Sequence, residues 1–161
     1  MYYYKYNTKI GDLYLSCNDT QLLAISFTKK NSEHFIVKET KLIKKAICQI
    51  NEYLDKKRET FDLPLKIVGT DFQKAVYSQL LKIEYGTTKS YKDVAIAINR
   101  DKAYRAVGMA CNKNDFVIVI PCHRVIASNN NLQGYGGGLQ AKIDLLKLED
   151  LSVENNQVLS K

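Results

Sequence analysis

The chain has 161 residues, 45% of them hydrophobic, and carries a formal net charge of +7 at pH 7. This length allows one domain or two small ones, and the apolar fraction is enough for a globular core. Lys, Asp or Asn interrupts every apolar run, and the start, MYYYKYNTKIGDLYL, lacks the basic-then-apolar order of a signal peptide, which argues against a membrane-spanning or secreted protein.

The first third of the chain predicts a small β-rich domain. Three short segments, YYYKY, DLYLSC and LLAISF, are aromatic or aliphatic, and turn residues such as Gly11-Asp12 separate them. A helix is predicted next, over about residues 41–57, because apolar residues recur there at helical spacing. The segment KKRETFDLPLKIVG holds Pro64 and Gly69, and it is predicted to be the linker that ends this first domain, 1–69.

The second domain, 70–161, is predicted to begin with three helices. Thr70 to Gln73 has the spacing of a capping box, and Ser90 to Asp93 resembles a second cap, so a helix should follow each. A turn then leads to a third helix, KAYRAVGMACNK. Two short helices joined by a tight turn predict either a DNA-binding helix-turn-helix or an ordinary helical hairpin, and the pattern alone favours the hairpin.

Basic charge is concentrated in the same region. Between Gly86 and Asn114 there are six basic residues against two acidic ones, an excess of +4. A phosphate backbone would favour such a patch, although a basic chain is by itself a weak sign of nucleic-acid binding.

The stretch VIVIPCHRVIA, 117–127, is the most distinctive part of the sequence. The residues FVIVI predict a buried strand, and Pro121 should stop it, so that Cys122 lies at the end of the strand. His123 and Arg124 bring positive charge or donors close by, which favours a thiolate. Consecutive side chains in an extended chain point apart, so His123 can serve Cys122 only through a turn or a bridging water.

The remainder of the chain leaves several alternatives open. A base needs an orienting acid, and composition does not choose among Asp144, Glu149, Asp150 and Glu154. The loop SNNNLQGYGGG either lets a backbone approach a flat ligand or is a plain flexible connection. A helix, LQAKIDLLKLE, follows it, and the polar end DLSVENNQVLSK is expected to fray.

These segments, in this order, resemble a known family. SYKDVA, YRAVGMACNKN, VIVIPCHRVIA, a Gly-Tyr-x-Gly-Gly loop and LLKLE are similar to the C-terminal domain of the O6-alkylguanine-DNA alkyltransferases, over about residues 72–149. The resemblance implies an α/β (α+β) fold: an N-terminal RNase H-like α/β domain with a small antiparallel sheet, then a mostly helical domain that contains a DNA-binding helix-turn-helix. It implies no metal and no organic cofactor.

The resemblance also assigns a chemistry to each matching residue. Cys122 is the acceptor, whose thiolate irreversibly takes an alkyl group from O6-alkylguanine, and from O4-alkylthymine, in DNA. His123 takes the thiol proton through a water, and Glu149 orients His123. Asn114 braces the turn, and Tyr91 donates a proton to N3 of the departing base.

Further residues match positions that contact DNA or the base. Arg105 fills the gap that the flipped nucleotide leaves. The other expected DNA contacts are Tyr104, Ala106, Gly108 and Arg124, and the expected lining of the guanine pocket is Tyr91, Val125, Tyr135 and Gly136. The implied partner is double-stranded DNA, bound through its minor groove by a monomer in the cytoplasm, or in the nucleus if the source is eukaryotic.

The chain departs from the family pattern at a few positions. Tyr104 stands where a small residue is usual, Asp115 follows Asn114 where a proline is common, and Gly136 lacks a hydroxyl that some members use near O6. Cys17, Cys48 and His34 do not offer a set of four zinc ligands, so no zinc is expected, and Cys17, Cys48 and Cys111 are expected to be inert.

Three other interpretations of the function remain. Alkyltransferase-like proteins flag damage without repairing it and usually carry tryptophan in place of the acceptor, whereas this chain has Cys122 and no tryptophan. A regulatory DNA-binding protein would need a further sensor domain. A Cys-His hydrolase would need an oxyanion hole, and an adjacent Cys-His pair is poorly placed for direct proton transfer.

Overall fold

The computed structural model describes residues 1–30, 33–132, 135 and 137–159. The chain divides into two compact units. The first comprises Met1–Ile67 with Asp115–Val117, and the second comprises Val68–Asn114 with Ile118–Lys161. Among the described residues, no helix is both long and apolar enough to cross a membrane.

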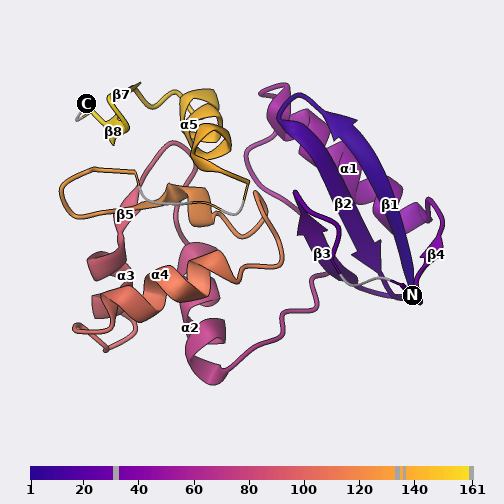
Figure 1. The fold of residues 1–161 in the computed structure, drawn as a ribbon, viewed down its shortest axis with the longest axis horizontal. Coiled ribbons are helices and arrows are strands. Elements are labelled where there is room, and N and C mark those ends of the chain that lie inside the picture. The colour runs from indigo at the N-terminus through magenta and orange to yellow at the C-terminus, as the bar shows by residue number, and fades with distance from the viewer. Residues whose placement is uncertain (31–32, 133–134, 136, 160–161) are drawn as a thin grey trace. The chain divides into compact units, whose positions relative to one another are not determined.

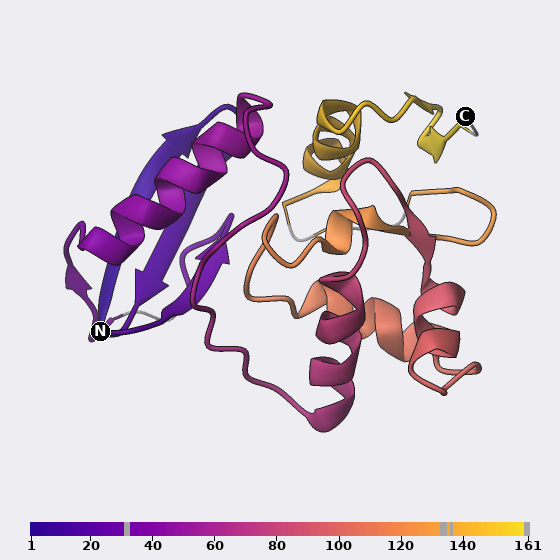
Figure 2. The same ribbon diagram turned by 180° about the vertical axis from the view of Figure 1, so that it is seen from behind.

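The first unit is a four-stranded sheet with one helix. The strands β1 (Tyr2–Thr8), β2 (Gly11–Cys17) and β3 (Leu22–Ser26) pair antiparallel, and the short β4 (Ile36–Val37) runs parallel to β1, in the order β3-β2-β1-β4. Helix α1 (Lys41–Leu54) lies along the sheet (Figure 2). The predicted mixture of sheet and helix is confirmed, with a parallel fourth strand that the sequence did not indicate.

The core of this unit lies between α1 and one face of the sheet. Alternate residues of β2 are buried because successive side chains of a strand point to opposite faces. Helix α1 buries the apolar stripe that predicted it, and the Thr40 side chain caps its first turn by accepting from the Ile43 amide. The predicted linker is partly tied to the sheet, because Leu65 forms a parallel bridge with Leu22.

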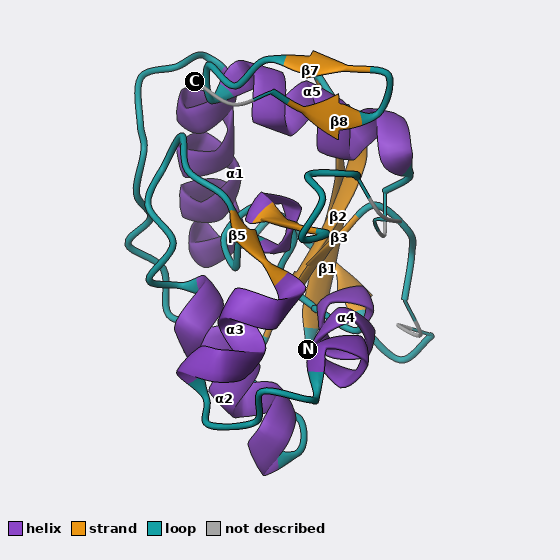
Figure 3. Ribbon diagram, turned by 90° about the vertical axis from the view of Figure 1, so that its left-hand side faces the viewer, coloured by secondary structure: helices purple, strands orange, loops and turns teal. Residues whose placement is uncertain are grey.

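The second unit is mostly helical (Figures 1 and 3). It holds α2 (Asp71–Leu80), α3 (Tyr91–Ala97), α4 (Tyr104–Asn112) and α5 (Leu139–Leu148), with a short parallel pair of strands, β5 (Lys89–Ser90) and β6 (Val125–Ile126). Both predicted caps are confirmed as capping boxes, Thr70 with Gln73 and Ser90 with Asp93. The turn between α3 and α4 gives the predicted pair of short helices.

The predicted strand FVIVI does not form. Phe116 makes a single bridge to Ile25 in the first unit, and residues 117–119 turn, with Ile118 at a φ of 72°. The segment is buried as expected. A run of apolar residues indicates that a segment is buried, but it does not show whether the backbone is an extended strand or, as here, a series of turns. Cys122 therefore does not lie at the end of a strand.

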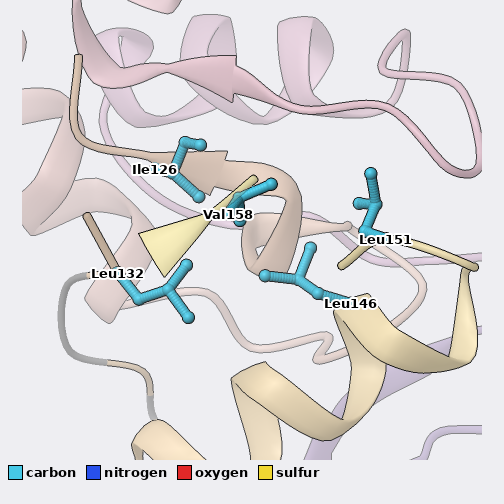
Figure 4. Close-up of a cluster of buried hydrophobic side chains, with 5 residues drawn as sticks. All are labelled: Ile126, Leu132, Leu146, Leu151 and Val158. Carbon is cyan, nitrogen blue, oxygen red and sulfur yellow. The ribbon is translucent and has the colours of Figure 1, made fainter. Parts of the chain in front are cut away.

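The predicted frayed end is also wrong for the described residues. Strands β7 (Val153–Glu154) and β8 (Gln157–Val158) form a hairpin, and Asn155 and Asn156 take the positive φ angles that a tight hairpin turn requires. Val158 packs in an apolar cluster (Figure 4). The members of this cluster are Ile126, Leu132, Leu146, Leu151 and Val158.

Candidate active site

The reactive stretch is a single turn of 3-10 helix that spans Cys122–Arg124. The Cys122 amide donates to the Ile120 carbonyl at 2.8 Å, and the Arg124 amide donates to the Pro121 carbonyl at 3.0 Å. The chain then extends into β6, which pairs with β5. The side chains of all three residues of this turn are buried. In an extended strand, successive side chains would have pointed to opposite faces.

Asn114 holds the sulfur of Cys122. Its Nδ2 donates to Cys122 Sγ at 3.2 Å and to the Ile120 carbonyl at 2.8 Å, and both side chains are buried, with Cys122 only 5% exposed. One amide therefore fixes the sulfur and the start of the turn together. An N–H aimed at sulfur stabilises a thiolate more than a thiol.

Burial nevertheless dominates the acidity of this thiol. It raises the pKa of Cys122, while the hydrogen bond from Asn114 and the positive charge of Lys142 act in the opposite direction. Neighbouring positive charge does favour the thiolate, but it comes from Lys142 and not from His123 or Arg124, and burial outweighs it. The thiol is neutral at pH 7, so a base must remove its proton before sulfur can attack.

Glu149 ties two residues of the turn together at the C-terminal end of α5. Its Oε2 lies 2.7 Å from His123 Nε2, and Arg124 donates to Oε1 from Nε at 2.8 Å and to Oε2 from Nη2 at 3.0 Å. The Gly86 amide donates to Oε1 at 3.0 Å. Of the four acids that composition left open, Glu149 is the one that the fold brings to His123.

The contacts of Glu149 determine which ring nitrogen of His123 carries the proton. A carboxylate paired with a guanidinium is ionised and can only accept, so Nε2 of His123 donates to it. Burial lowers the pKa of His123, although Glu149 alone would raise it. The imidazole is therefore neutral, and Nδ1 is the nitrogen able to accept a proton.

Arg124 does not fit its expected role as a DNA contact. It is buried, its Nη1 donates to the Ile83 carbonyl at 2.7 Å, and its other nitrogens donate to Glu149. A guanidinium with these partners is not available to a phosphate. Its place in the structure is to hold Glu149 and the turn.

Lys142 is a buried residue of the site that the sequence pattern did not predict. Its Nζ donates to the Val125 carbonyl at 2.8 Å and lies 3.5 Å from the Tyr91 hydroxyl. Burial lowers the pKa of Lys142, whereas the charges of the Cys122 and Cys111 thiolates would raise it. A signal was present, because Lys142 lies three residues after Leu139 and four before Leu146 on the apolar stripe of α5.

The remaining predicted site residues lie around α3 and α4 or near the turn. Tyr91 begins α3, and its ring faces Gly108 of α4, where an added Cβ would lie 3.7 Å from Tyr91 Cε1. Val125 is buried and Tyr135 is half-buried, while the prediction for Gly136 lies outside the described residues. Ala106 is exposed on α4.

A cavity of about 870 Å³ opens beside α4. Five residues of one helix face contribute to its wall, at positions 104, 105, 108, 109 and 112. Tyr91 and Lys92 of α3, residues 101 and 102, and residues 127 and 128 form the rest. The basic side chains that line it are Lys92, Lys102 and Arg105, against Asp101. Within the described residues, no group of three or more His, Cys, Asp and Glu side chains is arranged to hold a metal ion.

Two family models match the chain. One, described as 6-O-methylguanine DNA methyltransferase, DNA binding domain, matches residues 71–151, and the other, described as the ribonuclease-like domain of that enzyme, matches residues 1–67. The hairpin of β7 and β8 lies beyond the matched residues.

Individual relatives agree with these models. A methylated-DNA–protein-cysteine methyltransferase of Methanosarcina barkeri is 43% identical over 154 residues, covering 93% of this chain and 98% of its own. The constitutive one of Bacillus subtilis is 38% identical and covers 94% and 96%. A crystal structure of the Mycobacterium tuberculosis OGT protein in complex with DNA superposes with a TM-score of 0.87 at 37% identity, covering 92% of each chain. With both halves matched and such relatives along nearly all of its length, the chain belongs to the methylated-DNA–protein-cysteine methyltransferase family.

Proposed function

We propose that this protein repairs alkylated DNA by direct reversal, moving the alkyl group of O6-alkylguanine to Cys122 in a single, irreversible turnover. The observation that carries the assignment is the buried turn in which Asn114 holds the Cys122 sulfur beside a neutral His123 oriented by Glu149. The partner is double-stranded DNA, which the protein binds as a monomer in the cytoplasm, or in the nucleus of a eukaryote.

The reaction exchanges one bond for another. The thiol proton passes to Nδ1 of His123 through a water, and the thiolate attacks the alkyl carbon. The carbon–sulfur bond forms as the carbon–O6 bond breaks, and its electrons stay on guanine. Tyr91 donates its hydroxyl proton to N3 of the departing base, so that guanine leaves neutral, and Lys142, whose Nζ lies 3.5 Å from that hydroxyl, returns a proton to Tyr91. The thioether product is a poor leaving group, so the protein is consumed.

The duplex must be opened for this to occur. The alkyl carbon is hidden in the base stack, so the nucleotide rotates out, and Arg105 of α4 takes its place. Ala106 and Gly108 let the helix backbone approach the minor groove closely, while Val125 and Tyr135 contact the extruded base. O4-alkylthymine presents a similar carbon and is the second expected substrate.

The test uses duplex DNA that carries radiolabelled O6-methylguanine. The intact protein should take up about one label per molecule, on Cys122, because a single acceptor is available. Cys122→Ser should take up none, whereas Cys111→Ser should behave as the intact protein, since Cys111 is a second thiol whose pKa burial raises to about 12. Repeated turnover, or label uptake by Cys122→Ser, would refute the assignment.

A further inference from the structure

Helix α4 exposes two large apolar side chains to solvent. Met109 is 62% exposed and Tyr104 is 46% exposed, although the same helix buries Val107 and Ala110 against the rest of its unit. Met109 and Tyr104 therefore do not contribute to the core. Single exposed apolar residues are common, but these two lie on either side of Arg105 in the wall of one cavity.

The spacing along the helix relates these side chains to a base stack. Met109 follows Arg105 by four residues, which places it one turn further along the same face, about 6 Å along the axis. Two base steps of a nucleic-acid strand span about 7 Å. When Arg105 occupies the place of one nucleotide and α4 lies along the groove, Met109 therefore lies near the second base along the strand, where it contacts the step between that base and the one that flanks the flipped nucleotide.

Tyr104 is positioned on the other side of Arg105. The Arg105 guanidinium carbon lies 6.0 Å from the centroid of the Tyr104 ring, in cation–π contact. The ring can therefore hold the guanidinium in the free protein and then stack on an unpaired base when Arg105 inserts. Lys92 and Lys102 line the same cavity and supply the positive charge that a phosphate backbone requires.

We propose that Met109 and Tyr104 form an apolar wedge that contacts the bases flanking the flipped nucleotide in duplex DNA. This inference rests on the proposed repair function and adds to it the way in which this chain unstacks the duplex. Apolar side chains inserted between base steps unstack them and allow the duplex to bend around the protein. The wedge sets the affinity for duplex and the ease of opening, and it takes no part in the transfer of the alkyl group.

The test separates duplex opening from chemistry. Met109→Ala and Tyr104→Ala should each bind a duplex containing O6-methylguanine about tenfold more weakly, as the loss of one large buried apolar contact implies. A 2-aminopurine base beside the lesion should show less unstacking when the variants are added at saturating concentration. Reaction of both variants with free O6-benzylguanine should match that of the intact protein, because no stack has to be opened.

The chain offers matched controls. Leu81, at the end of α2, is 47% exposed and does not line the cavity, so Leu81→Ala should leave duplex binding unchanged. Met109→Leu and Tyr104→Phe should retain most of the affinity, because they keep the apolar bulk. If the alanine variants bind and unstack duplex like the intact protein, or lose free-base reactivity in equal measure, the wedge is wrong. If the intact protein itself fails to label Cys122, the repair function fails instead.

Discussion

Glu149 accepts hydrogen bonds from two neighbours of Cys122 at once. His123 and Arg124 follow each other in sequence, and a single buried carboxylate binds both because the 3-10 turn brings them to the same side. Burial keeps the His123 ring neutral, and the positive charge of Arg124 acts in the same direction. The charge states of Glu149, His123 and Arg124 are therefore coupled to one another.

Removing Arg124 alone should therefore be costly. Arg124→Met keeps the length of the side chain but leaves Glu149 buried without its cation, and such a loss typically costs about 3–5 kcal/mol of stability. Urea unfolding measures the change. The double variant Arg124→Met/Glu149→Gln should recover part of it, because the stranded charge is then gone. A double variant as unstable as the sum of the two single ones would contradict this coupling.

The stability of the protein should also depend on His123 at mildly acidic pH. Because burial lowers the pKa of His123 in the folded state, the neutral ring contributes stability above about pH 6.5, and this contribution is lost as the pH falls through the folded-state pKa. The free energy of unfolding should thus decline below pH 6.5, and His123→Gln should flatten that decline. His34, the other histidine, is exposed, and His34→Gln is the matched control for the substitution itself.

At the scale of elements, α3 depends on its capping box to place Tyr91. The Asp93 amide donates to Ser90 Oγ and the Ser90 amide donates to Asp93, each at 2.9 Å, and Tyr91 is the first residue of the helix. The capping box of α2 has the same design but holds no site residue. The two boxes form a matched pair for experiment.

Loss of either cap should cost about 1 kcal/mol of stability. Ser90→Ala should in addition slow alkyl transfer, because the first turn of α3 carries Tyr91, while Thr70→Ala should destabilise without slowing transfer in the folded protein. Thermal unfolding gives the first quantity, and single-turnover labelling at a temperature well below unfolding gives the second. Equal rates for the two variants would show that the cap does not position Tyr91.

Local patterns predicted local structure well and distant pairings poorly. The caps and the apolar stripe of α1 were readable, because each depends on residues within one or two turns. The run FVIVI was misread, because a buried turn and a buried strand have the same composition. Residues that meet only in the fold, such as His123 with Glu149, 26 positions apart, could be paired in advance only through the family resemblance.

At the scale of the whole molecule, the chain passes between the two units three times, after residues 67, 114 and 117. No single cut therefore separates them. Asp115–Val117 belong to the first unit, and Asn114, which holds the Cys122 sulfur, directly precedes them. The sequence pattern did not predict that residues 115–117 belong to the first unit, since this depends on their pairing with β3.

The C-terminal hairpin should contribute to stability even though it lies past the residues matched by the family. Val158 of β8 is buried in the apolar cluster with Ile126 and Leu146, so Val158→Ala should cost roughly 1.5–3 kcal/mol. Leu159, further along, is exposed, and Leu159→Ala should have little effect. Denaturant unfolding of the two variants checks this, and a Val158→Ala protein as stable as the intact one would mean that the hairpin is dispensable.

The tight packing around the Cys122 sulfur has a consequence for the molecule after repair. A methyl or larger substituent on that atom must find room where only 5% of the residue is exposed, and it crowds the amide of Asn114. Overpacking of a protein interior typically lowers the free energy of unfolding by about 1–3 kcal/mol. The alkylated protein should therefore have a lower melting temperature than the unreacted protein. The decrease should be larger for a benzyl adduct than for a methyl adduct.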